Sequence, residues 1–342
     1  MTAVTDAPSA RFEGARSCLE ACRLTEASVH TARNMVETRF HVPEGAARVR
    51  VLKKKESFVF HMLRSHSFAV IVFSALPVLA PTSAHSADKA AAPAQPAAKP
   101  GHDDTPMQAN GKWHIHDPNR PRPPVVTPGD CSNDKKPGAP PSDAIVLIGN
   151  GKDLSGWQHE DGSAVTWSMK GGVLQTGKGA IRTKQTFSDF QLHVEWASPK
   201  KVEGDGQGRG NSGVFLLGKF EVQVLDSYNN DTYSDGQASA MYGQYPPLVN
   251  ATRPPGKWQT YDIVFKAPRF KGDKVETPAT VTVLHNGVVT HAGTAYFGPT
   301  SWKQNPPYKP EHASGPIALQ DHGNPVSYRN MWIRPLKNYD EQ

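Results

Sequence analysis

The sequence predicts an all-β fold, a sandwich or jelly roll, over its C-terminal part. After Asp143, short runs rich in Val, Ile, Phe, Tyr and Trp are separated by Gly, Pro and Asn, and no long stretch has a helical period. Asn286 and Gly287 lie between TVTVLH and VVTH and suit a type I′ hairpin turn, in which both central residues have positive φ. Many short strands joined by such turns are typical of sandwiches and jelly rolls.

The predicted domain spans residues 143–338, and its strands follow one another at short spacing. Each candidate combines β-branched or aromatic residues with a flanking turn signal. In chain order, the candidate strands are 144–148, 166–176, 180–184, 189–198, 212–218, 220–226, 258–268, 279–291, 316–322 and 328–336.

Two of these strands have one apolar and one polar face. In 189–198, the segment FQLHVEW alternates apolar residues with Gln, His and Glu. In 220–226, FEVQV places Glu221 and Gln223 on the face opposite to its Phe and Val residues. An ordinary exposed face would favour Lys and Thr, whereas Gln, His and Glu can hydrogen-bond sugar hydroxyls or transfer protons. A solvated sheet face and a functional surface both remain open at this point.

Three segments precede the domain. In residues 62–87, Met62 and Arg64 precede an apolar run and small residues suited to cleavage, so we expect a signal peptide. The run is short for a spanning helix, and a cytoplasmic tail before a membrane anchor is the alternative. Because a secretion signal acts at the N-terminus, we expect residues 1–61 to be a misannotated upstream extension. Residues 88–142 are Ala/Pro-rich and then irregular, which is typical of a linker followed by an extension that drapes over the domain.

The charge of the expected mature chain argues against a nucleic-acid partner. The full chain has a net charge of +6, but residues 1–87 hold 11 Lys and Arg against 7 Asp and Glu, which leaves 27 basic and 25 acidic side chains. No Lys/Arg stripe remains to neutralise phosphates. We expect a periplasmic or secreted protein with no nucleic-acid partner and, after signal cleavage, no stable membrane insertion.

Three stretches resemble one family in the correct order: NGKDLSGWQHEDGSAVTWSMKGGVLQT, GRGNSGVFLLGKFEVQVLDSYNND and GPIALQDHGNPVSYRNMWIRPL. From about Ile145 to Leu336 the chain resembles the 3-keto-disaccharide hydrolase domain, a glycoside-hydrolase-16-like domain of exported bacterial proteins. The resemblance implies a concanavalin A-like jelly-roll β-sandwich with a carbohydrate site on its concave sheet. It also implies activity on glycosides whose C3 hydroxyl is oxidised to a ketone. Some members are described as lyases that eliminate across C1 and C2, after which the glycal is hydrated.

That chemistry accounts for an incomplete glycosidase pattern. Glu221, Gln223 and Asp226 have roughly the spacing of the nucleophile, orienting carboxylate and acid/base of laminarinase-type glycosidases, but the middle carboxylate is missing. A retaining glycosidase needs two carboxylates about 5 Å apart. Cleavage of a 3-keto-glycoside instead needs a base for the acidified C2 proton, a donor or cation for the enolate oxygen, and an acid for the departing oxygen.

Four residues are candidates for proton transfer. Glu221 is the first choice for the base, and Glu195 is the second carboxylate if the two strands are neighbours. His322 follows a strand and precedes a Gly turn, so it either reaches over the rim of a sheet as the acid or binds backbone in the turn. Asp226 begins a turn, where it either caps the DSYNND loop or takes part in catalysis.

The substrate-binding candidates extend that set. Gln223 would position the substrate, and Arg209 would hold the enolate or a hydroxyl, unless the polar residues of its Gly-rich loop only satisfy turns. His193 is a ligand, a base or a hydrogen-bonding filler. Aromatic side chains can stack on a sugar ring. The full set is Arg209, Asn211, Gln223, His193, Tyr242 and Trp258.

No cofactor is certain from the sequence, and a divalent metal is one option. The HIHD motif at 114–117 has suitable side chains without further ligands nearby, so a metal held by His193, Glu195 or His322 is the better candidate. Such a metal would stabilise an enolate. No phosphate loop, dinucleotide fingerprint or GxSxG elbow occurs, which disfavours nucleotide use and serine hydrolysis.

The resulting hypothesis is an exported enzyme that cleaves 3-keto-disaccharides or related 3-keto-glycosides, with the oxidised saccharide as its partner. A purely structural envelope protein is disfavoured by the polar side chains that repeat on the sheet face, and two further alternatives remain. A non-catalytic carbohydrate-binding module would bind a glycan and form no product. An ordinary laminarinase-type glycoside hydrolase is disfavoured by Gln223, because loss of the orienting carboxylate weakens control of the neighbouring acid.

Overall fold

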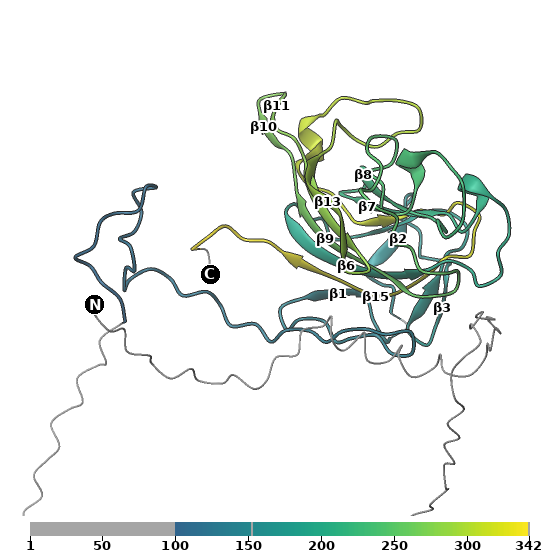
Figure 1. Ribbon diagram of the computed structural model, residues 1–342, viewed down its shortest axis with the longest axis horizontal. Helices are drawn as coiled ribbons and strands as arrows, with labels where there is room; N and C mark the ends of the chain where they lie inside the picture. Colours follow the sequence, from purple (N-terminus) through teal and green to yellow (C-terminus); the bar gives the residue numbers. More distant parts are fainter. Residues whose placement is uncertain (1–99, 152, 341–342) are drawn as a thin grey trace, which may run out of the picture. The chain divides into compact units, whose positions relative to one another are not determined.

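The chain folds into two facing β-sheets, as expected (Figure 1). The structure, a computed structural model, describes residues 100–151 and 153–340, and residues 102–340 belong to one compact unit. The strands pair antiparallel in both sheets, which confirms the jelly-roll prediction. The expected upstream extension (1–61), the signal peptide (62–87) and the first part of the linker lie outside the described residues.

The larger sheet has eight strands in the order β13-β12-β9-β6-β15-β4-β3, and β1 also pairs with β15. β15 is central, because it pairs with β6 along one edge and with β1 and β4 along the other. The strands are β1 (Ile145–Ile148), β3 (Ser168–Lys170), β4 (Val173–Gln175), β6 (Phe190–Ala197), β9 (Gln259–Lys266), β12 (Thr280–His285), β13 (Val288–Ala295) and β15 (Ser327–Pro335).

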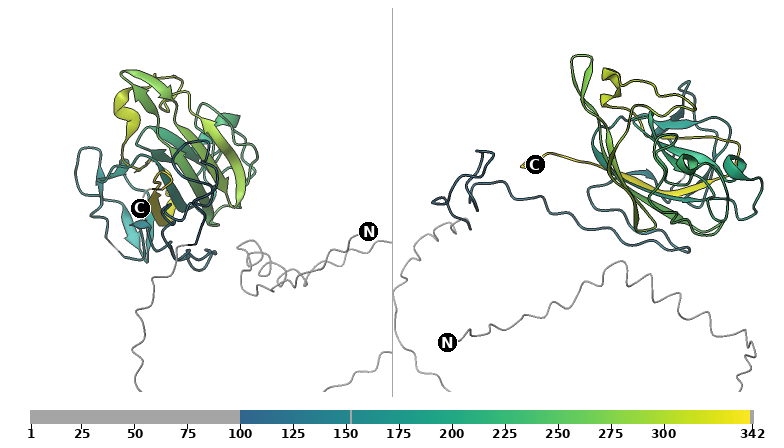
Figure 2. Two further views of the ribbon diagram at one scale, coloured as in Figure 1. Left: turned by 90° about the vertical axis from the view of Figure 1, so that its left-hand side faces the viewer. Right: turned by 45° about the horizontal axis from the view of Figure 1, so that its top comes forward.

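The smaller sheet has five strands in the order β2-β5-β14-β7-β8. They are β2 (Trp157–His159), β5 (Ile181–Thr183), β7 (Ser212–Leu216), β8 (Phe220–Val224) and β14 (Ala318–Leu319). A separate hairpin of β10 (Arg269–Lys271) and β11 (Lys274–Thr277) projects beyond the two sheets (Figure 2).

Helical structure within residues 100–340 is limited to short 3-10 turns. These are η1 (Gly206–Gly208), η2 (Ser234–Gly236) and η3 (Pro310–Ala313). The described residues include no helix with the length and apolar character needed to cross a membrane.

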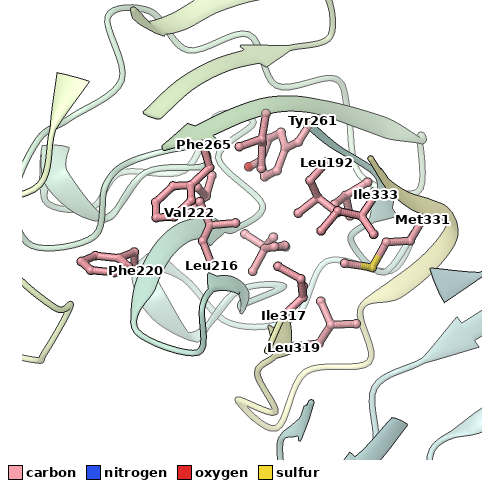
Figure 3. Close-up of a cluster of buried hydrophobic side chains, with 14 of the residues drawn as sticks. Leu192, Leu216, Phe220, Val222, Tyr261, Phe265, Ile317, Leu319, Met331 and Ile333 are labelled. Atoms are coloured by element: carbon pink, nitrogen blue, oxygen red, sulfur yellow. The ribbon is translucent and has the colours of Figure 1, made fainter. Parts of the chain in front are cut away.

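Apolar side chains of the two sheets meet between them (Figure 3). Phe220 of β8 lies 5.7 Å from Phe265 of β9, and Phe190 of β6 lies 5.2 Å from Phe265, as measured between ring centroids. All three side chains are fully buried. Removing this apolar surface from water is the main stabilising contribution to such a core. Figure 3 labels Phe220 and Phe265 together with Leu192, Leu216, Val222, Tyr261, Ile317, Leu319, Met331 and Ile333.

The predicted alternation along β6 and β8 is confirmed. The apolar positions of both strands are buried between the sheets. However, β6 belongs to the larger sheet and β8 to the smaller sheet. Because the apolar faces of the two strands meet in the core, their polar faces lie on opposite sides of the sandwich.

The hairpin turn between β12 and β13 also agrees with its prediction. Asn286 and Gly287 have φ values of 53° and 81°, and they connect the paired residues His285 and Val288. Both central residues therefore adopt the left-handed conformation that a type I′ turn requires.

We expect Phe265→Ala to lower the free energy of unfolding by about 3–5 kcal/mol, because it removes a buried ring that contacts aromatic side chains of both sheets. Urea unfolding followed by tryptophan fluorescence measures this change. Phe297→Ala is the matched control, since Phe297 is 60% exposed and its loss should cost less than about 0.5 kcal/mol. Equal losses in the two variants would contradict the assignment of the core.

Candidate functional site

A pocket lies over the outer face of the smaller sheet, where β7 and β8 carry their outward side chains. In the β7–β8 pair, Glu221 stands opposite Phe215, and Gln223 stands opposite Gly213. The pocket, called the Glu221 pocket below, has a volume of about 490 Å³, within the range of roughly 300–1,000 Å³ typical of small-molecule sites. Its lining residues are Gln207, Asn211, Phe215, Glu221, Gln223, Tyr233, Tyr242, Thr300, Ser301, Trp302, Gln320 and His322.

The Glu221 carboxyl group is buried without a charged partner. Its side chain lies over Gly213, where a Cβ atom would overlap the Oε1 atom, so the carboxyl group depends on the absence of a side chain at 213. Glu221 is 3% exposed, and among the described residues none donates a hydrogen bond to its carboxyl group. Burial raises the pKa of Glu221 to about 8. A carboxyl group with a pKa near neutrality is suited to general acid–base chemistry.

The backbone of Glu221 is held at both of its polar groups. Its N–H donates to Thr300 Oγ1 at 3.0 Å, and its carbonyl oxygen accepts from the Tyr296 hydroxyl at 3.1 Å. Tyr296 is buried in the core. The carboxyl group is therefore presented from a rigid strand rather than from a loop.

Two amide side chains bring unpaired acceptors to the pocket. Gln223 Nε2 donates to Gln207 Oε1 at 3.0 Å, and Asn211 Nδ2 donates to the Gln207 carbonyl at 2.7 Å. The Oε1 atom of Gln223 and the Oδ1 atom of Asn211 are buried without a hydrogen-bond partner within the described part of the chain. Buried polar atoms normally have partners, so these two oxygens are suited to accept hydrogen bonds from the hydroxyls of a bound sugar.

A pair of tyrosine hydroxyls lines another side of the pocket. The hydroxyl oxygens of Tyr233 and Tyr242 are 2.7 Å apart. Burial, together with the hydrogen bond to Tyr233, raises the pKa of Tyr242 above its ordinary value. Tyr242 therefore stays neutral near physiological pH and can donate a hydrogen bond.

The structure brings His322 to the same pocket as Glu221. The carboxylate of the neighbouring Asp321 accepts from the backbone N–H groups of Gly179 and Gly323, each at 2.8 Å, and so holds the turn that carries His322. Glu221 and His322 line the same pocket, and the role of His322 as an acid stays a prediction.

Arg209 and Asp226 do not line the pocket. Arg209 Nε donates to Asp226 Oδ2 at 2.8 Å, and its other nitrogens donate to the carbonyls of Tyr228 and Asn229. Asp226 Oδ1 also accepts from the Tyr228 backbone N–H at 3.2 Å. These contacts agree with turn stabilisation, which was one of the two interpretations of each residue. The guanidinium and the carboxylate pair with each other, and their remaining hydrogen bonds go to the backbone of the loop.

Glu195, His193 and Trp258 lie elsewhere. β6 belongs to the larger sheet and β8 to the smaller sheet, so the condition under which Glu195 would be the second carboxylate is not met. Glu195 and His193 point from the outer face of the larger sheet, on the opposite side of the sandwich from Glu221. The Trp258 ring lies against the Arg329 guanidinium of that same face, 4.1 Å from its ring centroid. The structure therefore does not bring these three side chains to the Glu221 pocket.

On that outer face, Glu195 is the centre of a buried polar network. Its carboxylate accepts from Arg329 Nε and Asn330 Nδ2, each at 2.6 Å, and from the Ser132 hydroxyl. Burial alone would raise the pKa of Glu195, but hydrogen bonds from four neighbouring side chains outweigh it and lower the pKa. Arg329 also donates to the Asn133 carbonyl at 2.6 Å, so the network ties the extension before the domain to the sheet.

His193 completes this network. Its Nδ1 atom is 2.7 Å from Asp262 Oδ1, and its Nε2 atom is 3.5 Å from Glu195 Oε1. Burial alone would lower the pKa of His193, but the two carboxylates outweigh it and raise the pKa to about 9. The ring stacks on Trp332 with centroids 5.1 Å apart. His193 is therefore a charged structural residue at neutral pH.

The described ranges 100–151 and 153–340 contain no group of three or more His, Cys, Asp and Glu side chains arranged to hold a metal ion. In the HIHD motif, Asp117 accepts from the backbone N–H groups of His114 and Asn119 and closes a turn. His114 Nδ1 contacts the Thr105 carbonyl.

Several lining residues were not predicted from the sequence. Phe215 and Gln320 had a usable signal, because alternation places Phe215 on the outward face of β7, and Gln320 is two residues before His322. Tyr233 and Trp302 lie in irregular segments, and Gln207 lies in the short 3-10 turn η1. No period indicates the direction of a side chain there.

The family of the domain is established by comparison with known proteins. Residues 143–334 match the family model of the 3-keto-alpha-glucoside-1,2-lyase-like domain. The chain belongs to this family. The matched range includes all of β7 and β8 and every residue that lines the Glu221 pocket.

Two relatives add detail to this family assignment. A 3-keto-disaccharide hydrolase of Bacteroides thetaiotaomicron is 27% identical over 242 residues, covering 57% of this chain and 79% of that protein. A solved structure of a candidate glycosyl hydrolase from Parabacteroides distasonis aligns with a TM-score of 0.60 and 46% identity, covering 68% of this chain and 100% of that one. These likenesses support a carbohydrate-active enzyme.

We expect His193→Gln to reduce stability in a pH-dependent manner. The folded pKa of His193, about 9, exceeds its ordinary value of 6.5, so its contribution is fully present below about pH 6.5 and is lost as the pH rises through 9. In urea unfolding, the free energy of unfolding of the wild type should exceed that of the variant by about 2–3 kcal/mol at pH 6 and by much less at pH 10. Glu221 titrates in both proteins, so its contribution to the pH dependence of stability cancels in this difference. A difference that stays constant from pH 6 to 10 would refute the network.

Proposed function

We propose that this protein cleaves glycosides oxidised at C3, with Glu221 as the base that removes the C2 proton. One observation carries the proposal: within the described part of the chain, Glu221 is the single carboxyl group lining the pocket, and it is buried without a counter-charge. The ketone at C3 makes the C2 proton acidic, so one base of raised pKa is sufficient to start the reaction.

The same arrangement speaks against an ordinary glycosidase. Retaining enzymes use two carboxyl groups about 5–5.5 Å apart, and inverting enzymes use two that are about 6.5–9.5 Å apart. In the Glu221 pocket, the neighbouring outward position of β8 is Gln223. The relative from Bacteroides thetaiotaomicron, described as a 3-keto-disaccharide hydrolase, supports the oxidised substrate.

The proposed reaction begins when Glu221 takes the C2 proton and the electron pair of the C2–H bond moves toward the C3 ketone, which gives an enolate. The enolate then expels the C1 substituent, so the C1–O bond breaks and a C1–C2 double bond forms. The departing oxygen takes a proton, for which His322 is our candidate donor. Addition of water across C1 and C2 would complete a net hydrolysis. The hydroxyl of Tyr242 and the amide of Gln320 are candidate donors to the enolate oxygen.

A carbohydrate-binding module is the competing function, because the same pocket could hold a sugar without turnover. The raised pKa of Glu221 favours the enzyme, since burial of an unpaired carboxyl group is costly and binding alone does not need it.

Export to the periplasm or the medium is also a proposal, and it rests on residues 62–87. Activity measured before and after chelation, with and without added divalent ions, tests the expectation of a metal.

Purified protein should cleave a 3-keto-disaccharide and leave the unoxidised parent intact, and Glu221→Gln should lower kcat by about 10²–10⁴-fold. Product formation followed by chromatography measures both effects. Glu203→Gln is the matched control, since Glu203 is an exposed carboxylate outside the pocket, and its activity should be unchanged. Equal cleavage of the oxidised and parent sugars would overturn the keto mechanism.

The activity should depend on pH through Glu221. Because the pKa is about 8, the carboxyl group is mostly protonated at neutral pH and becomes the active base as the pH rises. When removal of the C2 proton limits the rate, kcat/KM should therefore rise roughly tenfold per pH unit below pH 8 and level off above it. With C2 proton removal limiting the rate, a rate that is flat from pH 6 to 8 would exclude Glu221 as the base.

A further inference from the structure

A second pocket adjoins the Glu221 pocket. It has a volume of about 350 Å³ and is called the Trp302 pocket below. The two pockets share four lining residues, so they form one continuous groove rather than two separate sites. The shared residues are Tyr233, Tyr242, Ser301 and Trp302; the residues found only in the Trp302 pocket are Asp235, Gly243, Lys303, Gln304 and Asn305.

The chemistry of the Trp302 pocket is that of a sugar-binding surface. Trp302 is 66% exposed, whereas Trp157, Trp167 and Trp196 are buried in the core. The Lys303 ammonium lies 4.3 Å from the Trp302 ring centroid. Beside the indole, the pocket offers carboxylate, ammonium and amide groups that can pair with hydroxyls. An aromatic face next to convergent polar groups suits a pyranose ring, which has an apolar C–H face and a polar rim.

The loop that carries Trp302 is fixed to the strand that carries Glu221. The backbone N–H of Thr300 donates to the Lys219 carbonyl at 2.8 Å, and Thr300 Oγ1 accepts from the Glu221 backbone at 3.0 Å. At the base of the loop, Gln244 Nε2 donates to the Gly298 carbonyl at 3.0 Å. The backbone two residues before Trp302 is therefore held beside the strand that carries the proposed base.

Tyr233 and Tyr242, whose hydroxyl oxygens are 2.7 Å apart, line both pockets. A substrate with its oxidised ring beside Glu221 and its next ring on Trp302 would pass the connecting bond along these hydroxyls. Both are hydrogen-bonding groups, so they are suited to contact the oxygen that joins the rings.

We propose that the Trp302 pocket binds the leaving-group sugar and that the Trp302 indole stacks on this second ring, so that Trp302 sets KM mainly for substrates that carry a second ring. This inference rests on the proposed function. Trp302 acts as a positioning residue for the second ring and has no part in proton transfer.

The test compares two substrates, a 3-keto-disaccharide and the methyl 3-keto-glucoside, which lacks a second ring. Trp302→Ala should raise KM for the disaccharide about tenfold and raise KM for the methyl glycoside much less, because the second ring of the disaccharide makes most of the contact with the indole. Trp302→Phe, which keeps an aromatic ring, should recover part of the loss. Phe297→Ala is the control, since Phe297 is similarly exposed and lines neither pocket.

The outcomes separate the two proposals. Suppose that the wild type cleaves both substrates. If Trp302→Ala then leaves both KM values unchanged, or raises both by the same factor, the leaving-group site is overturned and the proposed function stands. If the wild type cleaves neither substrate, the proposed function fails instead. Thermal unfolding of each variant detects any folding defect. Because Trp302 is exposed, its replacement should leave the melting temperature unchanged.

Discussion

The outward direction of one strand position is the constraint on which the site depends. In β8, Phe220 and Val222 are fully buried against the larger sheet, so strand alternation turns Glu221 to the opposite face. A one-residue slip of β8 would place the carboxyl group in the core and the Phe ring in solvent. The packing energy of the core therefore fixes the direction of the carboxyl group, and Gly213 on β7 leaves the space it occupies.

The two buried glutamates of the sandwich illustrate how the environment decides the role of a carboxyl group. Glu195 is surrounded by donors, including Arg329 and His193, and its pKa is lowered despite burial. Glu221 is buried beside neutral groups, and its pKa is raised to about 8. The first arrangement stabilises a permanent anion that joins the extension to the sheet. The second allows a proton to be exchanged near neutral pH, which is what a general base requires.

One side of the groove is formed by a rigid strand, and the other side is formed by aromatic residues in irregular segments. Glu221 and Gln223 are presented from a strand whose backbone is bonded on both sides. The aromatic wall comes from irregular segments, but Thr300 bonds the Trp302 loop directly to the Glu221 backbone. Positioning of this kind is worth more to catalysis than additional contacts, because misplacement of reacting groups is costly.

What the sequence by itself determined was local: the all-β class, the Asn286-Gly287 turn, the alternation of each strand, and Glu221 as an outward carboxyl group. What only the tertiary structure decided was which outward faces share a surface. Alternation repeats every two residues and specifies a face, but the sheet that a strand joins depends on partners far away in the chain. β6 pairs with β15, more than 100 residues later, so Glu195 lies opposite to Glu221, while loops without any period bring Trp302 to the groove.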